Sequence, residues 1–314
     1  MSVTIKFTHP IGVKNLEIEN FKSIKSLKLE CKKVNIFIGE PNTGKSNILE
    51  TIGMFSYLYY KKYSNIEEFV RMDNMINWFY QSGIDEKIKI KFDEEFLEIE
   101  HINEQFIGKI ESKNKVCKYT YGALGISGAL GIVSHELKGC KPFKLYKFRL
   151  GKMFPGTETE FLYPPYGNNL FMILRTHKEL RELIKELFEP FGLKIVLRYD
   201  ENKIEVQREE EEDIISAFPY SSISDTLQRV VFYLTILETN KDSVIALEEP
   251  ESNSFPYYTK YLAERIAFDK TNQFFISTHN PYFLMSVLEK TQKDDIGIFI
   301  TYFKDYQTKV KALT

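Results

Sequence analysis

Alternation of apolar and polar residues predicts several strands in the first half of the chain. Residues 15–29 alternate in this way and predict two short strands joined by a turn. Residues 87–121 contain three further alternating stretches. Strict alternation is typical of antiparallel sheets with one solvated face, so the strands within 87–121 are expected in a side lobe and not in a parallel core.

The second half of the chain shows a different pattern, in which short apolar runs alternate with helical periodicity. It predicts in turn helix 225–238, strand 244–247, helix 256–268, strand 273–277, helix 281–290 and strand 296–303. Alternating units of this kind favour a parallel sheet covered by helices.

A small lobe is expected between these two regions. Residues 178–188 have the spacing of an amphipathic helix, ended by Pro190 and Gly192, and strands are predicted over 193–199 and 204–207. The acidic run from Glu209 to Asp213 is interpreted as a solvated loop.

Composition limits the classes of function. With 314 residues, 43% of them hydrophobic, the chain is long enough for a large α/β core, and its net charge of −2 argues against coating nucleic acid by bulk charge. Cys31, Cys117 and Cys140 lie far apart and form no metal-binding spacing. No apolar signal region or membrane-length run is present, so we expect a soluble cytoplasmic protein without membrane contact.

Residues 39–46 form a complete phosphate-binding loop, G-x-x-x-x-G-K-[ST]. Its members are Gly39, Glu40, Pro41, Asn42, Thr43, Gly44, Lys45 and Ser46. An apolar run at 34–38 predicts a strand before it, and a helical pattern starts after it at Asn47, which we expect to bind the nucleotide together with the loop. An ordinary strand–helix turn can contain Gly-Lys-Ser by chance, but the context on both sides favours a nucleotide site at the helix N-terminus. In such a loop Lys45 pairs with the β- and γ-phosphates, and the Ser46 hydroxyl reaches Mg²⁺.

Two further strand ends carry polar groups. The strand 244–247 is followed by Glu248, Glu249 and Glu251, which would emerge near the phosphate loop if both strands share one sheet. Glu248 would then bind Mg²⁺ and Glu249 would polarise the attacking water. The alternative is a polar cap on a buried strand.

His279 follows the strand 273–277 and could hydrogen-bond the γ-phosphate or the attacking water. The alternative interpretation of this segment is a helix start, in which Thr278 or Asn280 caps a helix that begins at Pro281. Both interpretations can hold together.

These elements together resemble the ATPase heads of the ABC superfamily, in the RecF/SMC-like branch that includes the OLD-family ATPases. Residues 16–24 resemble the opening strand of that branch, 39–46 its Walker A motif, 248–251 its Walker B ending and 277–281 its switch-histidine segment. The resemblance covers about 15–55 and 215–303. It implies ATP and Mg²⁺ as ligands, Glu249 as the general base and His279 as a γ-phosphate sensor.

The resemblance also implies a signature loop that contacts the γ-phosphate bound by a partner subunit, and Ser224 takes its serine position. Asp225 and Thr226 replace the usual glycines, so Ser224 could equally be a plain helix cap. Glu248 also differs from the family pattern, because aspartate is common at that position. Gln81 is a weak candidate for the Q-loop glutamine. Neither the long coiled coil of SMC heads nor the nuclease domain of OLD proteins is expected.

Residues 138–152 carry six basic residues, no acidic ones and interleaved aromatic rings. Such a segment could contact nucleic acid or a partner protein. The favoured interpretation is a strand with one solvated basic face and one buried aromatic face.

The sequence thus predicts one P-loop NTPase of the ABC type, with a mostly parallel core sheet flanked by helices. Its parts would be 1–86 with the phosphate loop, an antiparallel side lobe at 87–165, a helical lobe at 166–220, and 221–314 with the remaining motifs. The expected function is an ATPase that pairs as a homodimer around ATP, in DNA maintenance or defence against invading DNA. The alternatives are a nucleotide-gated adaptor with little turnover and a small-molecule P-loop kinase.

Overall fold

The central element is a six-stranded sheet with the strand order β15-β14-β3-β13-β12-β8. The computed structural model describes residues 12–112, 115–121, 142–211 and 214–313. The strands of this sheet are β3 (Val34–Ile38), β8 (Phe143–Tyr146), β12 (Val244–Glu248), β13 (Gln273–Ser277), β14 (Ile296–Lys304) and β15 (Gln307–Leu313). All neighbours are parallel except β15, which pairs antiparallel with β14. The predicted parallel core is therefore confirmed.

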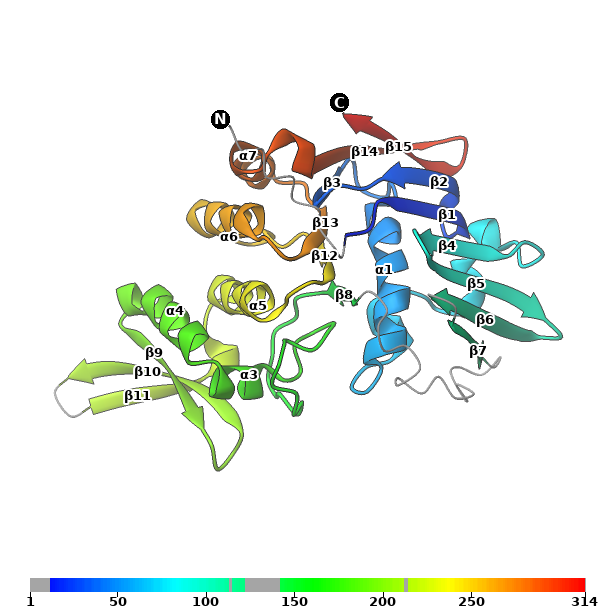
Figure 1. Ribbon diagram of the computed structural model, residues 1–314. Helices are drawn as coiled ribbons and strands as arrows, with labels where there is room; N and C mark the ends of the chain where they lie inside the picture. The colour runs from blue at the N-terminus through cyan, green and yellow to red at the C-terminus, as the bar shows by residue number, and fades with distance from the viewer. Residues whose placement is uncertain (1–11, 113–114, 122–141, 212–213, 314) are drawn as a thin grey trace, which may run out of the picture.

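Helices cover both faces of this sheet (Figure 1). On one face lies α1 (Lys45–Tyr60), and on the other lie α5 (Asp225–Thr239), α6 (Pro256–Phe268) and α7 (Pro281–Lys290). Because successive side chains of a strand point to opposite faces, neighbouring residues of β3 serve two cores. Ile36 packs in the cluster on the side of α5 to α7, and Phe37 packs with α1. Burial on both faces explains the continuous apolar runs of the sequence.

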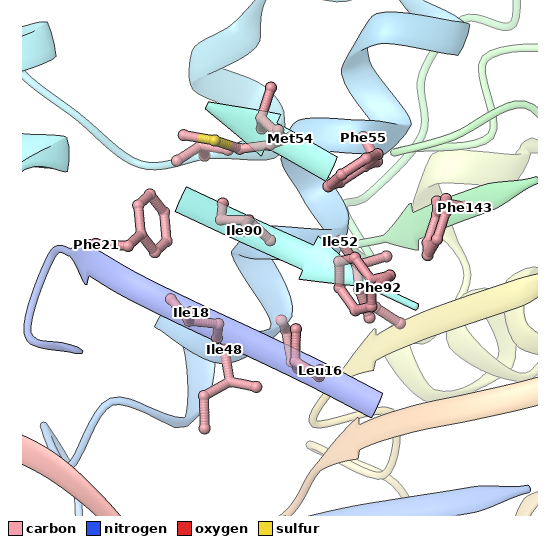
Figure 2. Packing of buried hydrophobic residues seen from close by; sticks show 14 of the residues in the cluster. Leu16, Ile18, Phe21, Ile48, Ile52, Met54, Phe55, Ile90, Phe92 and Phe143 are labelled. Carbon is pink, nitrogen blue, oxygen red and sulfur yellow. The ribbon is translucent and has the colours of Figure 1, made fainter. Parts of the chain in front are cut away.

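A second, antiparallel sheet packs against the opposite side of α1, with the order β2-β1-β4-β5-β6-β7. Its strands are β1 (Asn15–Phe21), β2 (Ile24–Glu30), β4 (Ile88–Phe92), β5 (Glu95–Ile102), β6 (Gln105–Ser112) and β7 (Lys115–Tyr121). Figure 2 shows Leu16 and Ile18 of β1 and Ile90 and Phe92 of β4 gathered with Ile48, Ile52 and Phe55 of α1. The helix of the phosphate loop is thus enclosed between two sheets.

A small lobe lies at the far side of the core sheet (Figure 1). It contains α3 (Leu170–Thr176), α4 (Lys178–Phe188) and a three-stranded antiparallel sheet of β9 (Leu193–Arg198), β10 (Lys203–Glu211) and β11 (Ile214–Pro219). The predicted amphipathic helix 178–188 is confirmed, and it buries Leu180, Ile184 and Phe188. A short helix, α2 (Ile66–Phe69), and short 3₁₀ turns follow α1.

Several expectations differ from the structure. The strands β1 and β2 belong to the antiparallel sheet, and β8 pairs with β12 in the core sheet although it lies within 87–165. Glu209 to Glu211 extend strand β10 and are not a loop, while Asp213 lies outside the described residues. Strands β11 and β15 were not predicted. The extent of each of these strands, and the sheet it joins, depend on the neighbouring strand that supplies its hydrogen bonds. A pattern along the sequence does not reveal that neighbour.

The basic segment also differs from its favoured interpretation. Of residues 138–152, those up to 141 lie outside the described residues, and β8 is buried along its whole length. The Lys144 amine donates to Asn240 Oδ1 over 2.5 Å and lies 3.5 Å from the centre of the Phe161 ring. Burial lowers the pKa of Lys144 to about 7. The expected solvated basic face is therefore wrong for β8.

Candidate active site

The phosphate loop connects β3 to α1 and contains two glycines with a left-handed backbone. Gly39 has φ 149° and Gly44, directly before α1, has φ 94°. A Cβ atom on Gly39 would lie 2.2 Å from the Thr301 carbonyl oxygen, and one on Gly44 would lie 2.1 Å from Thr308 Oγ1. Both positions therefore require glycine for conformation and for space.

The β14–β15 hairpin supports this loop from behind. The hydroxyls of Thr43 and Thr301 are 2.7 Å apart, and the Thr308 hydroxyl donates to the Thr43 carbonyl oxygen over 3.0 Å. The Thr308 hydroxyl is also 2.6 Å from the hydroxyl of Ser23 in the β1–β2 turn. Threonines far away in sequence thus fix the loop in a shape that presents the N-terminus of α1.

A cavity of about 300 Å³ lies in front of the phosphate loop, and we call it the phosphate cavity. Its lining combines Ser23, Pro41, Asn42, Gly44, Lys45, Ser46, Asn47, Arg71, Glu249 and His279. Residues more than 200 positions apart therefore line one cavity. Free N–H groups at a helix N-terminus and the positive end of its dipole favour an anion there.

Ser46 and Glu248, the two predicted magnesium ligands, are in direct contact. The Ser46 hydroxyl donates to Glu248 Oε1, which joins the start of α1 to the end of β12. Among the described residues, no group of three or more His, Cys, Asp or Glu is arranged to hold a metal. A hydroxyl and one carboxylate fit Mg²⁺ in the way that nucleotide sites use it, since phosphate oxygens and water supply the remaining ligands.

The Lys45 side chain is buried in the loop. Its amine donates to the carbonyl oxygens of Gly39 and Glu40, each over 2.8 Å. Burial lowers the pKa of Lys45 from its usual value, and the nearby Glu249 carboxylate counteracts this shift. The amine is thus held at the loop, next to the cavity.

Glu249 and His279 lie side by side at the carboxyl ends of β12 and β13. His279 Nε2 is 3.4 Å from Glu249 Oε1, and both side chains are about half-exposed. The Ser252 hydroxyl donates to Glu249 Oε2 over 3.1 Å. Glu249 has φ 43°, a backbone conformation that is costly for a residue other than glycine and that concentrates at functional sites. Its backbone N–H donates to the Ser277 carbonyl oxygen over 3.0 Å, which joins the ends of β12 and β13.

The helix-start interpretation of the segment around His279 is confirmed. Asn280 accepts hydrogen bonds from the N–H groups of Tyr282 and Phe283 and caps α7. The Thr278 hydroxyl donates to Glu251, which is buried and whose pKa is raised by that burial. Glu251 therefore ties the end of β12 to the end of β13 and holds Glu249 beside His279.

Ser224 does not line the phosphate cavity. It caps α5, accepting a hydrogen bond from the Leu227 N–H over 3.3 Å, and lies beside a different, apolar cavity. Asp225 pairs with Arg229 of its own helix at 2.8 Å, and Thr226 donates to the Asn253 carbonyl oxygen. The carboxylate of Asp225 is thus neutralised within α5. A contact of Ser224 with a phosphate would need a second subunit.

The sequence interpretation missed a charged cluster beside the phosphate cavity. Glu50 of α1 is 1% exposed and accepts hydrogen bonds from Lys22 Nζ and, over 2.7 Å, from Arg71 Nε. Arg71 follows α2 and lines the phosphate cavity. The only signal for this cluster is an acidic residue within the apolar run 48–52, since nothing in the sequence marks Arg71.

Gln81, the weak Q-loop candidate, does not line the phosphate cavity. It lines a second cavity next to it and donates to the Tyr80 hydroxyl over 3.2 Å. Of the basic segment, Lys147 donates to the Phe69 carbonyl oxygen and Arg149 pairs with Glu68 at 3.3 Å. Its described part therefore presents no continuous basic surface.

Comparison with known proteins agrees with this architecture. Residues 12–217 match the sequence model of the family described as "AAA ATPase domain", and residues 163–286 match that of "AAA domain, putative AbiEii toxin, Type IV TA system". The first match covers more than half of the chain, so the protein belongs to the AAA ATPase domain family. No curated protein sequence matches the chain.

Solved structures of SMC heads share the fold. One is an SMC head bound to the C-terminal winged-helix domain of ScpA, with a TM-score of 0.57 and 14% identity over 96% of this chain and 97% of that one. Another is the Pyrococcus furiosus Smc head with an extended coiled coil, bound to the C-terminal domain of ScpA. It has a TM-score of 0.59 and 12% identity over 96% of each chain. The chain thus has the fold of SMC ATPase heads, and the predicted fold class is confirmed.

No helix in the described part of the chain has both the length and the apolar character needed to cross a membrane.

Proposed function

We propose that the protein binds ATP with Mg²⁺ in the phosphate cavity and hydrolyses it. The observation that carries the proposal is that Lys45, Ser46, Glu249 and His279 line one cavity although they come from two distant parts of the sequence. Lys45 and the N–H groups of residues 42–47 bind the β- and γ-phosphates. Arg71 adds a second cation, held in place by Glu50.

Ser46 and Glu248 would hold the magnesium ion together with phosphate oxygens, and the ion would neutralise the charge that develops on the phosphates. Glu249 accepts the proton of the water that attacks the γ-phosphorus, as the bond to the ADP oxygen breaks. His279 lies 3.4 Å from Glu249 and donates to the γ-phosphate or to the attacking water. Phosphate and ADP are then released.

The proposal includes pairing of two heads around ATP. Ser224 caps α5 and lies outside the phosphate cavity of its own chain, so the second subunit would bring it to the γ-phosphate. The Asp225–Arg229 ion pair supports this role, because it turns the acidic side chain away from an incoming phosphate. ATP would then act as a switch, since it raises the affinity between subunits only until it is hydrolysed.

The decisive experiment compares ATP hydrolysis by wild type and Glu249→Gln. Glutamine keeps the shape and the contact with Ser252 but cannot accept a proton, so we expect turnover to fall at least about 100-fold with ATP affinity retained. Glu209→Gln, at an exposed position near the end of β10, is the matched control and should retain full activity. Undiminished turnover by Glu249→Gln would remove Glu249 from the mechanism.

A nucleotide-gated adaptor with little turnover is the second candidate function. The replacement of the signature glycines by Asp225 and Thr226 favours it, because glycine allows the closest approach of backbone to phosphate. ATP-dependent pairing in a wild-type protein that does not hydrolyse ATP would select this alternative. DNA maintenance or defence, and contact with nucleic acid or a partner protein through 138–152, remain predictions of the sequence.

A further inference from the structure

A second cavity of about 710 Å³ adjoins the phosphate cavity, and we call it the tyrosine cavity. It is lined by Lys22, Ser23, Glu67, Arg71, Met72, Asp73, Asn77, Phe79, Tyr80, Gln81, Ser82 and Tyr306. Ser23 and Arg71 line both cavities. The volume lies within the range of about 300–1,000 Å³ that is typical of small-molecule sites.

A nucleotide whose terminal phosphates bind in the phosphate cavity would point its nucleoside end toward the tyrosine cavity. Lys45 and the Ser46–Glu248 contact mark the end where the terminal phosphates would bind. Asn47, one residue further along α1, donates from Nδ2 to Ser23 Oγ over 2.7 Å. The nucleoside end would therefore leave the phosphate cavity on the side of Ser23, where the tyrosine cavity begins.

Two tyrosines from distant parts of the chain meet at this cavity. Tyr306 is in the turn between β14 and β15, and its side chain is strongly exposed, with a fraction of 79%. The Tyr80 hydroxyl donates to the Tyr306 carbonyl oxygen over 3.3 Å, which joins the 3₁₀ segment after α2 to the hairpin. The hairpin is fixed in turn by the contacts of Thr308 with Ser23 and Thr43. The Tyr306 ring is thus carried by the same hairpin that supports the phosphate loop.

Both segments that carry the tyrosines turn sharply through residues with a left-handed backbone. Gln81 and Ser82 have φ 50° and 58°, and Asp305 and Tyr306 have φ 50° and 58°. Each segment thus contains two neighbouring residues with a left-handed backbone, and none of the four is glycine. At Asp305 and Tyr306 this is the ordinary conformation of a two-residue hairpin turn, which Asn103 and Glu104 also adopt, and the tight turn holds Tyr306 at the tip of the hairpin.

We propose that the tyrosine cavity binds the nucleoside part of the nucleotide, with the base stacked on the Tyr306 ring and Tyr80 beside it. This inference rests on the proposed function, because it assumes that a triphosphate occupies the phosphate cavity. It adds a base site built by the C-terminal hairpin, a part of the chain that carries none of the sequence motifs. Aromatic rings suit this role because every base has a stacking face.

The apolar cavity beside Ser224 is a poorer place for the base, although its volume of about 810 Å³ is similar. It shares no lining residue with the phosphate cavity. A nucleotide whose phosphates bind at Lys45 therefore reaches the tyrosine cavity and not the apolar one within a single chain.

The test measures the binding of Mg·ATP and of inorganic magnesium tripolyphosphate by calorimetry to wild type and three variants. Tyr306→Ala should weaken ATP binding about 5- to 30-fold, because stacking on one base is worth about 1–2 kcal/mol, and should leave tripolyphosphate binding unchanged. Tyr306→Phe should bind ATP within about twofold of wild type, since the ring is kept. Tyr302→Ala is the matched control, since Tyr302 is an exposed tyrosine of the same hairpin that does not line the cavity.

The outcomes separate the two proposals. If wild type binds both ligands and Tyr306→Ala binds ATP as tightly as wild type does, the base site is wrong and the phosphate site stands. An equal loss of ATP and tripolyphosphate binding in Tyr306→Ala would also contradict the base site, because it indicates a damaged phosphate loop. If wild type binds neither ligand, the proposed function and the base site both fail.

Discussion

Buried charged side chains are the residues that sequence patterns describe least well in this protein. Glu50, Lys144 and Glu251 are each at most 4% exposed, and each has a specific partner. An unpaired buried charge costs several kcal/mol, so such residues persist only where partners from other elements compensate them. Here Glu50 orders Arg71 at the phosphate cavity and Glu251 orders the segment of His279.

The first prediction concerns the pH dependence of stability that Lys144 causes. Burial lowers its pKa to about 7 in the folded protein, against 10.5 for the exposed side chain. Between these values the unfolded chain binds the additional proton, so the contribution of Lys144 becomes more favourable as the pH rises from 7 to 10. The penalty for burying the charge is fully present below pH 7.

The measurement is urea unfolding of wild type and Lys144→Met at pH 6.5 and pH 9.5. The stability of wild type relative to Lys144→Met should increase at the higher pH. Comparing the two proteins at each pH removes the titration of all other groups, including the nearby Glu160. A difference in stability that does not change with pH would show that Lys144 keeps its ordinary pKa.

At the scale of elements, the phosphate loop depends on a hairpin that lies about 260 residues further along the chain. Thr301 and Thr308 can approach the loop so closely only because Gly39 and Gly44 carry no Cβ atom. The same hairpin carries Tyr306 to the tyrosine cavity. One element without any recognised motif therefore supports two parts of the proposed nucleotide site.

The prediction at this scale is that Thr308→Val weakens both stability and nucleotide binding. Thr308 is fully buried, and valine keeps its shape but loses the hydrogen bonds to Thr43 and Ser23. The loss of buried hydrogen bonds should cost about 1–3 kcal/mol of unfolding free energy. ATP affinity should fall as well, because the loop is less well fixed.

Urea unfolding and ATP calorimetry would measure the two effects. Thr308→Ser keeps the hydroxyl and is the matched control, with ATP binding close to that of wild type. If Thr308→Val binds ATP as wild type does, the hairpin does not position the loop.

At the scale of the whole molecule, the core sheet holds the phosphate site on its carboxyl edge, and the small lobe with the start of α5 lies at a distance from it. Ser224 lies outside the phosphate cavity, so its proposed contact with the γ-phosphate would require an assembly of two chains. The last prediction is that Glu249→Gln with Mg·ATP forms a dimer of twice 36.9 kDa, while the nucleotide-free protein is a monomer.

Light scattering coupled to gel filtration would measure the mass with and without ATP. The double variant Ser224→Arg, Glu249→Gln should remain monomeric with ATP bound, because the long arginine side chain would prevent close contact of the two heads. If Glu249→Gln stays a monomer at saturating ATP, the proposed pairing of two heads around ATP is wrong. Hydrolysis of ATP by a single chain would then still be possible.

The sequence by itself determined the local chemistry and the order of the elements. The phosphate loop, the acidic strand end at Glu248 and Glu249, and the cap at Asn280 follow from short stretches of chain, as do α4, α6 and α7. These features depend on backbone propensity, turn chemistry and periodicity, all of which act over a few residues.

Only the tertiary structure decided which distant residues share one environment. The placement of β8 in the core sheet, the support of the phosphate loop by Thr301 and Thr308, and the meeting of Arg71, Glu50 and Lys22 all depend on strand pairing and burial between segments far apart in sequence. No local pattern encodes these contacts, because the energy of each one comes from a partner that only the folded chain supplies.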